Sequence, residues 1–316
     1  NRHVQAFCDP NGVEVFHAVQ HMNDIYRPDP FDVHEIHQEA RGRFERLLNR
    51  HGRAPLPSAG SILLLKGRAG SGKTHLMRAF RDRVHREGLG YFGYLQLTTA
   101  TDNYSRYLLR GLVEHLEKPY HEENDARTGL RRLSDEMAES STTLRRQFGD
   151  TKGRALETLR EGELTRQTIV RLVEYLADSI VHEPGFQHVD VDLIRALLYL
   201  QTGNPVLVNK VSKYLRCEPL TAQDERALGG IHSRTEESDP EWMLEKLAGL
   251  MWTAQGGILV MAVDQIEDVF TLDHAEERFT RAVTALKTLA DALPSSIVVL
   301  ACLEDYYVRL SQALPK

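Results

Sequence analysis

The chain has 316 residues, enough for one large domain or two ordinary ones. Its 41% hydrophobic and 27% charged residues are typical of a globular protein, and its net charge of −6 excludes a surface that attracts nucleic acid everywhere. The longest apolar runs, 258–263 and 297–303, fall short of the roughly 20 residues that a membrane-spanning helix needs. Three widely spaced cysteines fit a reducing compartment, so we expect a cytoplasmic protein with no membrane partner.

The N-terminal part of the chain, residues 1–60, is predicted to be a lead-in to the first strand. Residues 25–50 read as an extended, proline-broken stretch followed by a helix, and residues 51–60 as a loop. The chain begins with Asn and stops about a dozen residues after its last predicted strand. We therefore expect it to be a fragment of a longer polypeptide.

The strongest local signal is "GRAGSGKT" at residues 67–74, which fits the phosphate-binding pattern G-x-x-x-x-G-K-[ST]. The segment before it, 61–66, predicts a buried strand, and the segment after it, 73–87, has apolar residues at helical spacing. Glycines allow the backbone to form a concave nest of N–H groups, and the positive end of the helix favours the same anion. The alternative is an ordinary glycine-rich turn between strand and helix.

This pattern assigns a role to each of its side chains. Lys73 is expected to reach the β- and γ-phosphates of a nucleotide and to act in catalysis, and the Thr74 hydroxyl is expected to ligate Mg²⁺. The predicted nucleotide-binding residues of the loop and the helix start are Gly67, Ala69, Gly70, Ser71, Gly72, Lys73, Thr74 and His75.

Past the second predicted strand, 89–98, the strand pattern stops and residues 102–256 read almost entirely as helices. Asp190 is predicted to cap one of these helices. We divide the chain into the lead-in, a first half of the core at 61–101, a helical insertion at 102–256 and a second half at 257–316.

Two basic clusters lie in the insertion, at 127–133 and 144–154, and could touch nucleic-acid phosphates. Acidic residues are interleaved with them, which favours solvated helix faces. The histidines at 17–21 and 34–37 have no Cys/His pair at ligand spacing, so we interpret them as surface residues.

The second half of a nucleotide site is predicted at "ILVMAVDQIEDVF", 258–270. Its apolar run is typical of a central parallel strand, and Asp264 follows at the carboxyl end, where ligands collect in α/β sheets. Asp264 is therefore the predicted metal-side carboxylate. Glu267 is the candidate for polarising the attacking water, and Gln265 could orient it through its amide. The alternative is that Glu267 and Asp268 only cap or solvate the next turn.

A further strand is predicted at 295–302, after a helix at 274–293. A polar side chain near the end of such a strand would be placed to contact the γ-phosphate. The groups available there are Cys302, Glu304 and Asp305, and none of them is the Asn, Thr or Arg that is typical of this role.

Together these segments resemble a known group, the AAA+/ORC-like and STAND-type P-loop ATPases of bacterial antiphage defence, including BREX-type ATP-binding proteins. The resemblance rests on the segments 213–230, 242–252 and 255–270, on "DPFDVHEIH" at 29–37 and on "VVLACLEDYYVRL" at 298–310. It implies a P-loop NTPase fold, an α/β parallel sheet flanked by helices with the large helical insertion between its second and Walker B strands.

The resemblance also implies functions for particular residues. Lys73 and Thr74 take the Walker A roles, Asp264 the Walker B magnesium role and Glu267 the water-activating role, while Phe31 and Val33 lie near adenine. The chain departs from the family where Gln265 follows Asp264 in place of a glutamate. Such assemblies supply an arginine finger in trans, and Arg309 is the residue of this chain considered for that role.

We therefore expect an ATP-binding and ATP-hydrolysing, Mg²⁺-dependent motor or switch that forms a homo-oligomer. The resemblance adds an effector protein of a defence operon as a partner and leaves nucleic acid open. Gln265 motivates a different hypothesis, a scaffold ordered by nucleotide with little or no hydrolysis. A small-molecule P-loop kinase is a third reading, which leaves the helical insertion unexplained.

Overall fold

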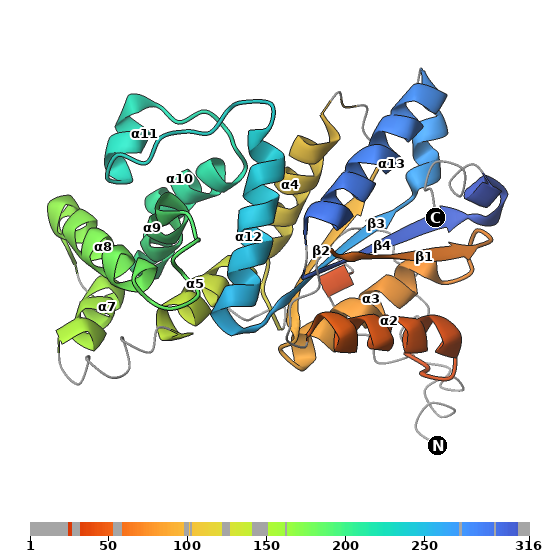
Figure 1. The fold of residues 1–316 in the computed structure, drawn as a ribbon, viewed down its shortest axis with the longest axis horizontal. Coiled ribbons are helices and arrows are strands. Elements are labelled where there is room, and N and C mark those ends of the chain that lie inside the picture. The colour runs from red at the N-terminus through yellow and green to blue at the C-terminus, as the bar shows by residue number, and fades with distance from the viewer. Residues whose placement is uncertain are drawn as a thin grey trace, which may run out of the picture.

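The computed structural model describes residues 25–26, 32–52, 59–97, 101, 103–121, 127–140, 151–161, 163–271, 274–293 and 295–308. Within them the chain forms a four-stranded, all-parallel β-sheet with helices on both faces, which confirms the expected α/β class (Figure 1). In this described part no helix is long and apolar enough to cross a membrane.

The four strands do not lie in chain order. Their bounds are β1 Ser61–Gly67, β2 Gly90–Gln96, β3 Ile258–Asp264 and β4 Ser296–Leu303, and the order across the sheet is β1-β4-β3-β2. β4 thus pairs with both β1 and β3. Every residue of β3 is buried, because this strand has a neighbour on each side and helices over each face, which explains its uninterrupted apolar sequence.

One face of the sheet is covered by α2, Gln38–His51, and α3, Lys73–Arg86 (Figure 1). Phe44 of α2 stacks on Phe80 of α3 with ring centroids 3.9 Å apart, and both join a core with alternate residues of all four strands. Alternation arises because successive side chains of a strand point to opposite faces. The helix predicted at 73–87 therefore packs on the sheet through its apolar face.

The opposite face is covered by α4, Tyr104–Leu116, α12, Asp239–Gln255, and α13, Ala275–Ala292 (Figure 1). Their apolar residues pack on the other set of alternate strand residues, such as Met261 and Val298. The same core runs on without a break into the helices between β2 and β3. The sheet and the helical segment thus share one hydrophobic core.

The segment between β2 and β3 is helical wherever it is regular in the described residues. Besides α4 and α12 it contains α5 Gly129–Ser140, α7 Thr151–Glu161, α8 Arg166–Val181, α9 Val191–Tyr199, η2 Leu200–Thr202, α10 Pro205–Leu215 and α11 Ala222–Ala227. In Figure 1 these green helices lie beyond the β2 edge of the sheet. The Asp190 carboxylate accepts from the Leu193 N–H, which confirms the predicted cap of α9.

Parallel strands bring their carboxyl ends to one edge of the sheet. The loop after β1, the end of β3 and the end of β4 therefore meet there, followed by η3, Ile266–Thr271, and η4, Glu304–Tyr306. Candidate ligand-binding residues of an open α/β sheet are expected at this edge.

Candidate functional site

The loop that joins β1 to α3 needs its glycines. A Cβ on Gly67 would stand 2.5 Å from Ser71 Oγ, and Gly70 and Gly72 have φ values of 73° and 86°. Both values lie in the left-handed region, which glycine enters without steric cost. Gly72 precedes α3, whose N-terminus has no side-chain cap. The N-terminus of a helix is its positive end and favours an anion at that position.

Lys73 folds back over this loop. Its Nζ donates to the carbonyl oxygens of Gly67 and Arg68, each at 3.1 Å. These acceptors are neutral, whereas a phosphate oxygen would accept a stronger, charge-assisted hydrogen bond from the same ammonium group. The side chain is thus already held beside the loop whose backbone would surround an anion.

Thr74 and Asp264 join the two predicted halves of the site. The Thr74 hydroxyl donates to Asp264 Oδ2 at 2.5 Å, although the two residues are 190 positions apart. Asp264 Oδ1 accepts the N–H of Gln265 at 2.9 Å, and Asp264 is only 2% exposed. A buried carboxylate needs such donors, because desolvation of an unpaired charge is costly.

A tyrosine of the neighbouring strand completes the surroundings of Asp264. The Tyr94 hydroxyl donates to Asp264 Oδ2 at 3.0 Å and accepts from Gln96 Nε2 at 3.1 Å. Gln96 is the register partner of Asp264, and Tyr94 points to the same face because it lies two residues earlier. Burial, followed by the nearby Asp264 charge, raises the pKa of Tyr94 well above its usual value, so the hydroxyl keeps its proton.

Glu267 lies in η3, just beyond the end of β3. Its Oε2 accepts the N–H of Leu303, the last residue of β4, at 3.3 Å. Burial raises the pKa of Glu267 above its usual value, although that N–H and the charge of Lys73 act in the opposite direction. Both η3 carboxylates behave alike, since burial also raises the pKa of Asp268. A carboxylate with a raised pKa is better suited to accept a proton near neutral pH.

Gln265 has an unusual backbone. Its φ of 58° lies in the left-handed region, which non-glycine residues rarely adopt. The Gln265 carbonyl accepts the N–H of Asp268, so this conformation starts the turn that leads into η3. Strain of this kind is found at functional sites more often than elsewhere.

The polar groups predicted at the end of β4 have different surroundings. Cys302 is buried, which raises the pKa of its thiol to about 11. Glu304 makes a 3.9 Å ion pair with Arg68 of the loop, and both side chains are largely exposed. Such a pair contributes little to stability. Asp305 is exposed, and η4 carries it past the strand end.

The lead-in segment lies against the start of α3. Asp32 forms an ion pair with Arg41 of α2 at 2.5 Å. Its Oδ1 also lies within hydrogen-bonding distance of His75 Nε2, at 3.2 Å. His37 also lies beside the loop, with its Nε2 3.3 Å from the position of a Cβ on Gly72. Val33 is 45% exposed, whereas Phe31 and Arg309 lie outside the described residues. The expected contact of Val33 with adenine stays a prediction.

The oxygen donors at this edge fit Mg²⁺. Mg²⁺ is bound in proteins by one or two carboxylates together with substrate phosphates and waters, so a dedicated cage is not required. Asp264 and Thr74 supply a carboxylate and a hydroxyl within hydrogen-bonding distance of each other, at the start of the helix that follows the glycine-rich loop. Among the described residues no group of three or more His, Cys, Asp or Glu side chains could hold a metal by itself.

The two basic clusters and the histidine-containing segments were also candidate binding regions. In the basic cluster at 127–133, Arg127 and Arg131 pair with Asp135, and Arg132 pairs with Glu136 at 2.5 Å. The part of the second cluster at 144–150 and the histidines at 17–21 lie outside the described residues. His34 and His37 are exposed. The nucleic-acid contact stays a prediction.

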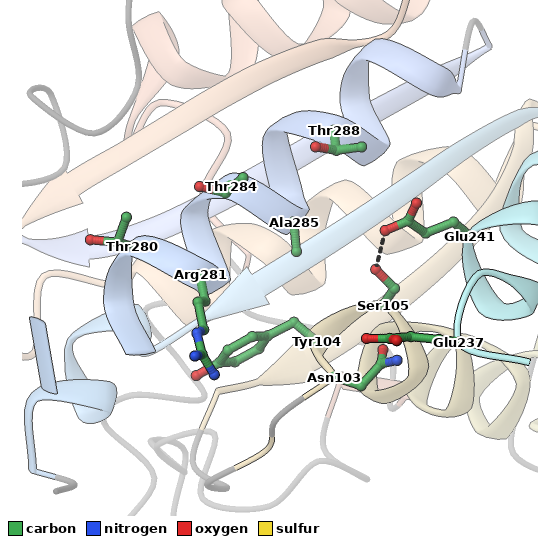
Figure 2. A pocket seen from close by; sticks show the side chains of 10 residues that line it. All are labelled: Asn103, Tyr104, Ser105, Glu237, Glu241, Thr280, Arg281, Thr284, Ala285 and Thr288. Atoms are coloured by element: carbon green, nitrogen blue, oxygen red, sulfur yellow. Dashed lines mark hydrogen bonds between the residues drawn. The ribbon is translucent and has the colours of Figure 1, made fainter. Parts of the chain in front are cut away.

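A separate groove of about 330 Å³ lies between α13 and the starts of α4 and α12 (Figure 2). Threonines 280, 284 and 288 line it along α13, and the starts of α4 and α12 form the other wall, where Ser105 donates to Glu241 at 2.8 Å. The loop after β1 does not contribute to its lining. The groove is thus distinct from the site around Asp264.

The sequence pattern led to the loop, Thr74, Asp264 and Glu267, but not to their neighbours. The sequence indicates Tyr94 and Gln96 only as strand residues, and Asp32 only as part of the lead-in. A signal for Gln96 is its polar side chain within a run of mostly apolar and aromatic residues. Comparison of the chain with protein-family models, curated proteins and solved structures found no match.

Proposed function

We propose that the protein is a P-loop NTPase that binds ATP with Mg²⁺ and hydrolyses it. The hydrogen bond between Thr74 and Asp264 carries this proposal. It places the hydroxyl of a G-x-x-x-x-G-K-[ST] loop against the carboxylate that ends a buried parallel strand. These are the two protein oxygens expected next to a nucleotide-bound Mg²⁺.

The residues of the site can divide the reaction among them. The loop N–H groups and Lys73 would bind the phosphates, and Lys73 would stabilise charge that develops on the transferred group. Bound Mg²⁺ would neutralise phosphate charge, held by Thr74 and Asp264. Glu267 would orient a water and accept its proton, which its raised pKa favours.

A second candidate function follows from Gln265. The residue directly after Asp264 carries an amide rather than a carboxylate, so water activation depends on Glu267. Glu267 in turn is tethered to the Leu303 N–H. A protein that uses nucleotide only to order an assembly interface would keep the loop and Asp264 but show no turnover. Oligomer formation, an effector partner and a role in antiphage defence belong to the proposal through the family resemblance alone.

The test of the proposed function is ATP turnover and nucleotide binding by Lys73→Ala. Loss of the ammonium group should reduce both, since it removes charge-assisted hydrogen bonds to phosphate. Lys246→Ala is the matched control, because Lys246 lies on α12 and pairs with Glu245 at 3.0 Å. ATP hydrolysis by Lys73→Ala at the wild-type rate would contradict the proposal. Nucleotide binding by the wild-type protein without turnover would favour the scaffold.

A further inference from the structure

The carboxylate of Asp264 is held from three directions. Oδ2 accepts from Thr74 at 2.5 Å and from Tyr94 at 3.0 Å, and Oδ1 accepts from the Gln265 N–H at 2.9 Å. An ionised carboxylate has about four acceptor positions. The protein donors therefore fix the plane of the group and leave little freedom to rotate.

Among these donors, Tyr94 is the one that lies in neither the loop and helix start at 67–75 nor the segment 258–270. Its side chain is 0% exposed, and its ring packs in the core between the sheet and α3. The hydroxyl is thus fixed in position before any ligand arrives. Gln96 Nε2 donates to the same hydroxyl oxygen at 3.1 Å, which directs the phenolic proton toward Asp264.

We propose that Tyr94, oriented by Gln96, is a positioning residue that sets the geometry of Asp264 for Mg²⁺. This inference rests on the proposed function and deepens it. Mg²⁺ demands near-ideal octahedral geometry, so a carboxylate near it must be held in one orientation. Hydrogen bonds to a group that faces a metal typically change metal affinity 10- to 100-fold when they are removed.

The chain offers a matched pair of substitutions on one strand. Tyr94→Phe removes the hydroxyl that reaches Asp264 and keeps the ring. Tyr91→Phe removes an equally buried hydroxyl that donates to the Glu136 carboxylate at 2.5 Å. Tyr91 packs on the other face of the sheet, away from Asp264. A general cost of losing a buried tyrosine–carboxylate bond would affect both variants.

The experiment is a calorimetric titration with ADP, first in EDTA and then over a series of Mg²⁺ concentrations. For Tyr94→Phe we expect unchanged ADP affinity in EDTA and about a tenfold higher Mg²⁺ concentration for half of the Mg²⁺-dependent gain. Tyr91→Phe should match the wild-type protein. Gln96→Met, at a half-buried position, should shift the Mg²⁺ dependence in the same direction by less.

The outcomes distinguish a failure of the inference about Tyr94 from a failure of the proposed function. If Tyr94→Phe has the wild-type Mg²⁺ dependence while Asp264→Asn does not, the inference about Tyr94 is overturned and the proposed function stands. If Tyr91→Phe shifts the Mg²⁺ dependence as much as Tyr94→Phe, the effect is structural and the inference is again overturned. If wild-type protein binds no ADP, or Mg²⁺ has no effect on its binding, the proposed function itself fails.

Discussion

The Thr74 hydroxyl donates to Asp264 Oδ2 at 2.5 Å across 190 positions of sequence. This contact depends on two separate features of the fold. α3 must begin directly at the end of the loop after β1, and β3 must end at the same edge of the sheet. The parallel arrangement provides the second condition, because all strands end on one side.

Glu267→Gln should separate binding from hydrolysis. The amide keeps the shape of the side chain and can still accept the Leu303 N–H, but it cannot take a proton from water. We expect turnover to fall by about 10² to 10⁴, with ATP affinity within a few-fold of wild type. Single-turnover hydrolysis and nucleotide titration measure the two effects.

Asp268→Asn is the control for Glu267→Gln, since burial raises the pKa of both side chains. Asp268 lies one residue further along η3 and is not assigned a role in the reaction. Equal loss of turnover in both variants would mean that η3 tolerates no change, and full activity in Glu267→Gln would remove Glu267 from the mechanism.

Substitutions at Gln265 should report on its left-handed backbone. Gln265→Gly removes the steric cost of this conformation and should stabilise the fold or leave it unchanged, within about 1 kcal/mol. Gln265→Val should destabilise it by more than about 1 kcal/mol, because β-branched residues are poorly tolerated at φ of 58°. Urea unfolding gives both values. A valine variant as stable as the glycine variant would show that the conformation is not retained.

His115 should make the stability depend on pH. Burial lowers the pKa of this imidazole from 6.5 to about 4, so between these values the unfolded chain binds a proton that the folded protein does not. The contribution of the neutral, buried His115 to the free energy of unfolding is fully present above pH 6.5, the pKa in the unfolded chain. It is lost as the pH drops toward 4, the pKa in the folded protein. The linkage amounts to about 2 kcal/mol between pH 7 and pH 5.

His115→Phe keeps a ring that can stack on Tyr26, whose centroid is 5.3 Å away. Its free energy of unfolding should therefore fall less than that of the wild-type protein between pH 7 and pH 5. The exposed His182, which directly follows α8, supplies the control His182→Phe, which should retain the wild-type pH dependence. Parallel curves for His115→Phe and wild type would mean that His115 is solvated and protonated in the fold.

Two glycines should respond oppositely to alanine. A Cβ on Gly90 would stand 2.0 Å from the Ile258 carbonyl oxygen, so Gly90→Ala must open the first pair of β2 and β3 and should cost about 2 kcal/mol or more. A Cβ on Gly249, inside α12, meets nothing within 4 Å, so Gly249→Ala should stabilise by about 0.5–1 kcal/mol. Thermal unfolding of the pair checks the predicted signs; a shared sign would contradict the packing at one of them.

The parts of the fold that the sequence predicted are those with local causes. The strand before the loop, the helix after it and the buried strand that ends at Asp264 follow from short-range patterns of apolar residues and glycines. The α9 cap at Asp190 is equally local, since it depends on a side chain and an N–H three residues apart. The site roles of Lys73, Thr74, Asp264 and Glu267 stay predictions, which the geometry supports and the experiments above test.

What the sequence could not predict depends on contacts between distant segments. The position of β4 between β1 and β3 follows from packing of the whole sheet, and no residue of β4 encodes its neighbours. Tyr94 lies beside Asp264 only because β2 pairs with β3 in the register that sets Gln96 opposite Asp264. The contact of His75 with the Asp32 carboxylate likewise needs the lead-in to return to α3.

The strand order has a consequence for how the chain folds during synthesis. β1 pairs only with β4 in the described sheet. The register partner of Leu63 is Val299, so this strand pair cannot form before β4 has been synthesised. Contacts so distant in sequence form slowly, because the entropy of closing the long intervening loop is lost before the contacts stabilise the fold. Until β4 leaves the ribosome, β1 and its loop have no neighbouring strand, and a chaperone that shields exposed strand edges would protect this chain most during that interval.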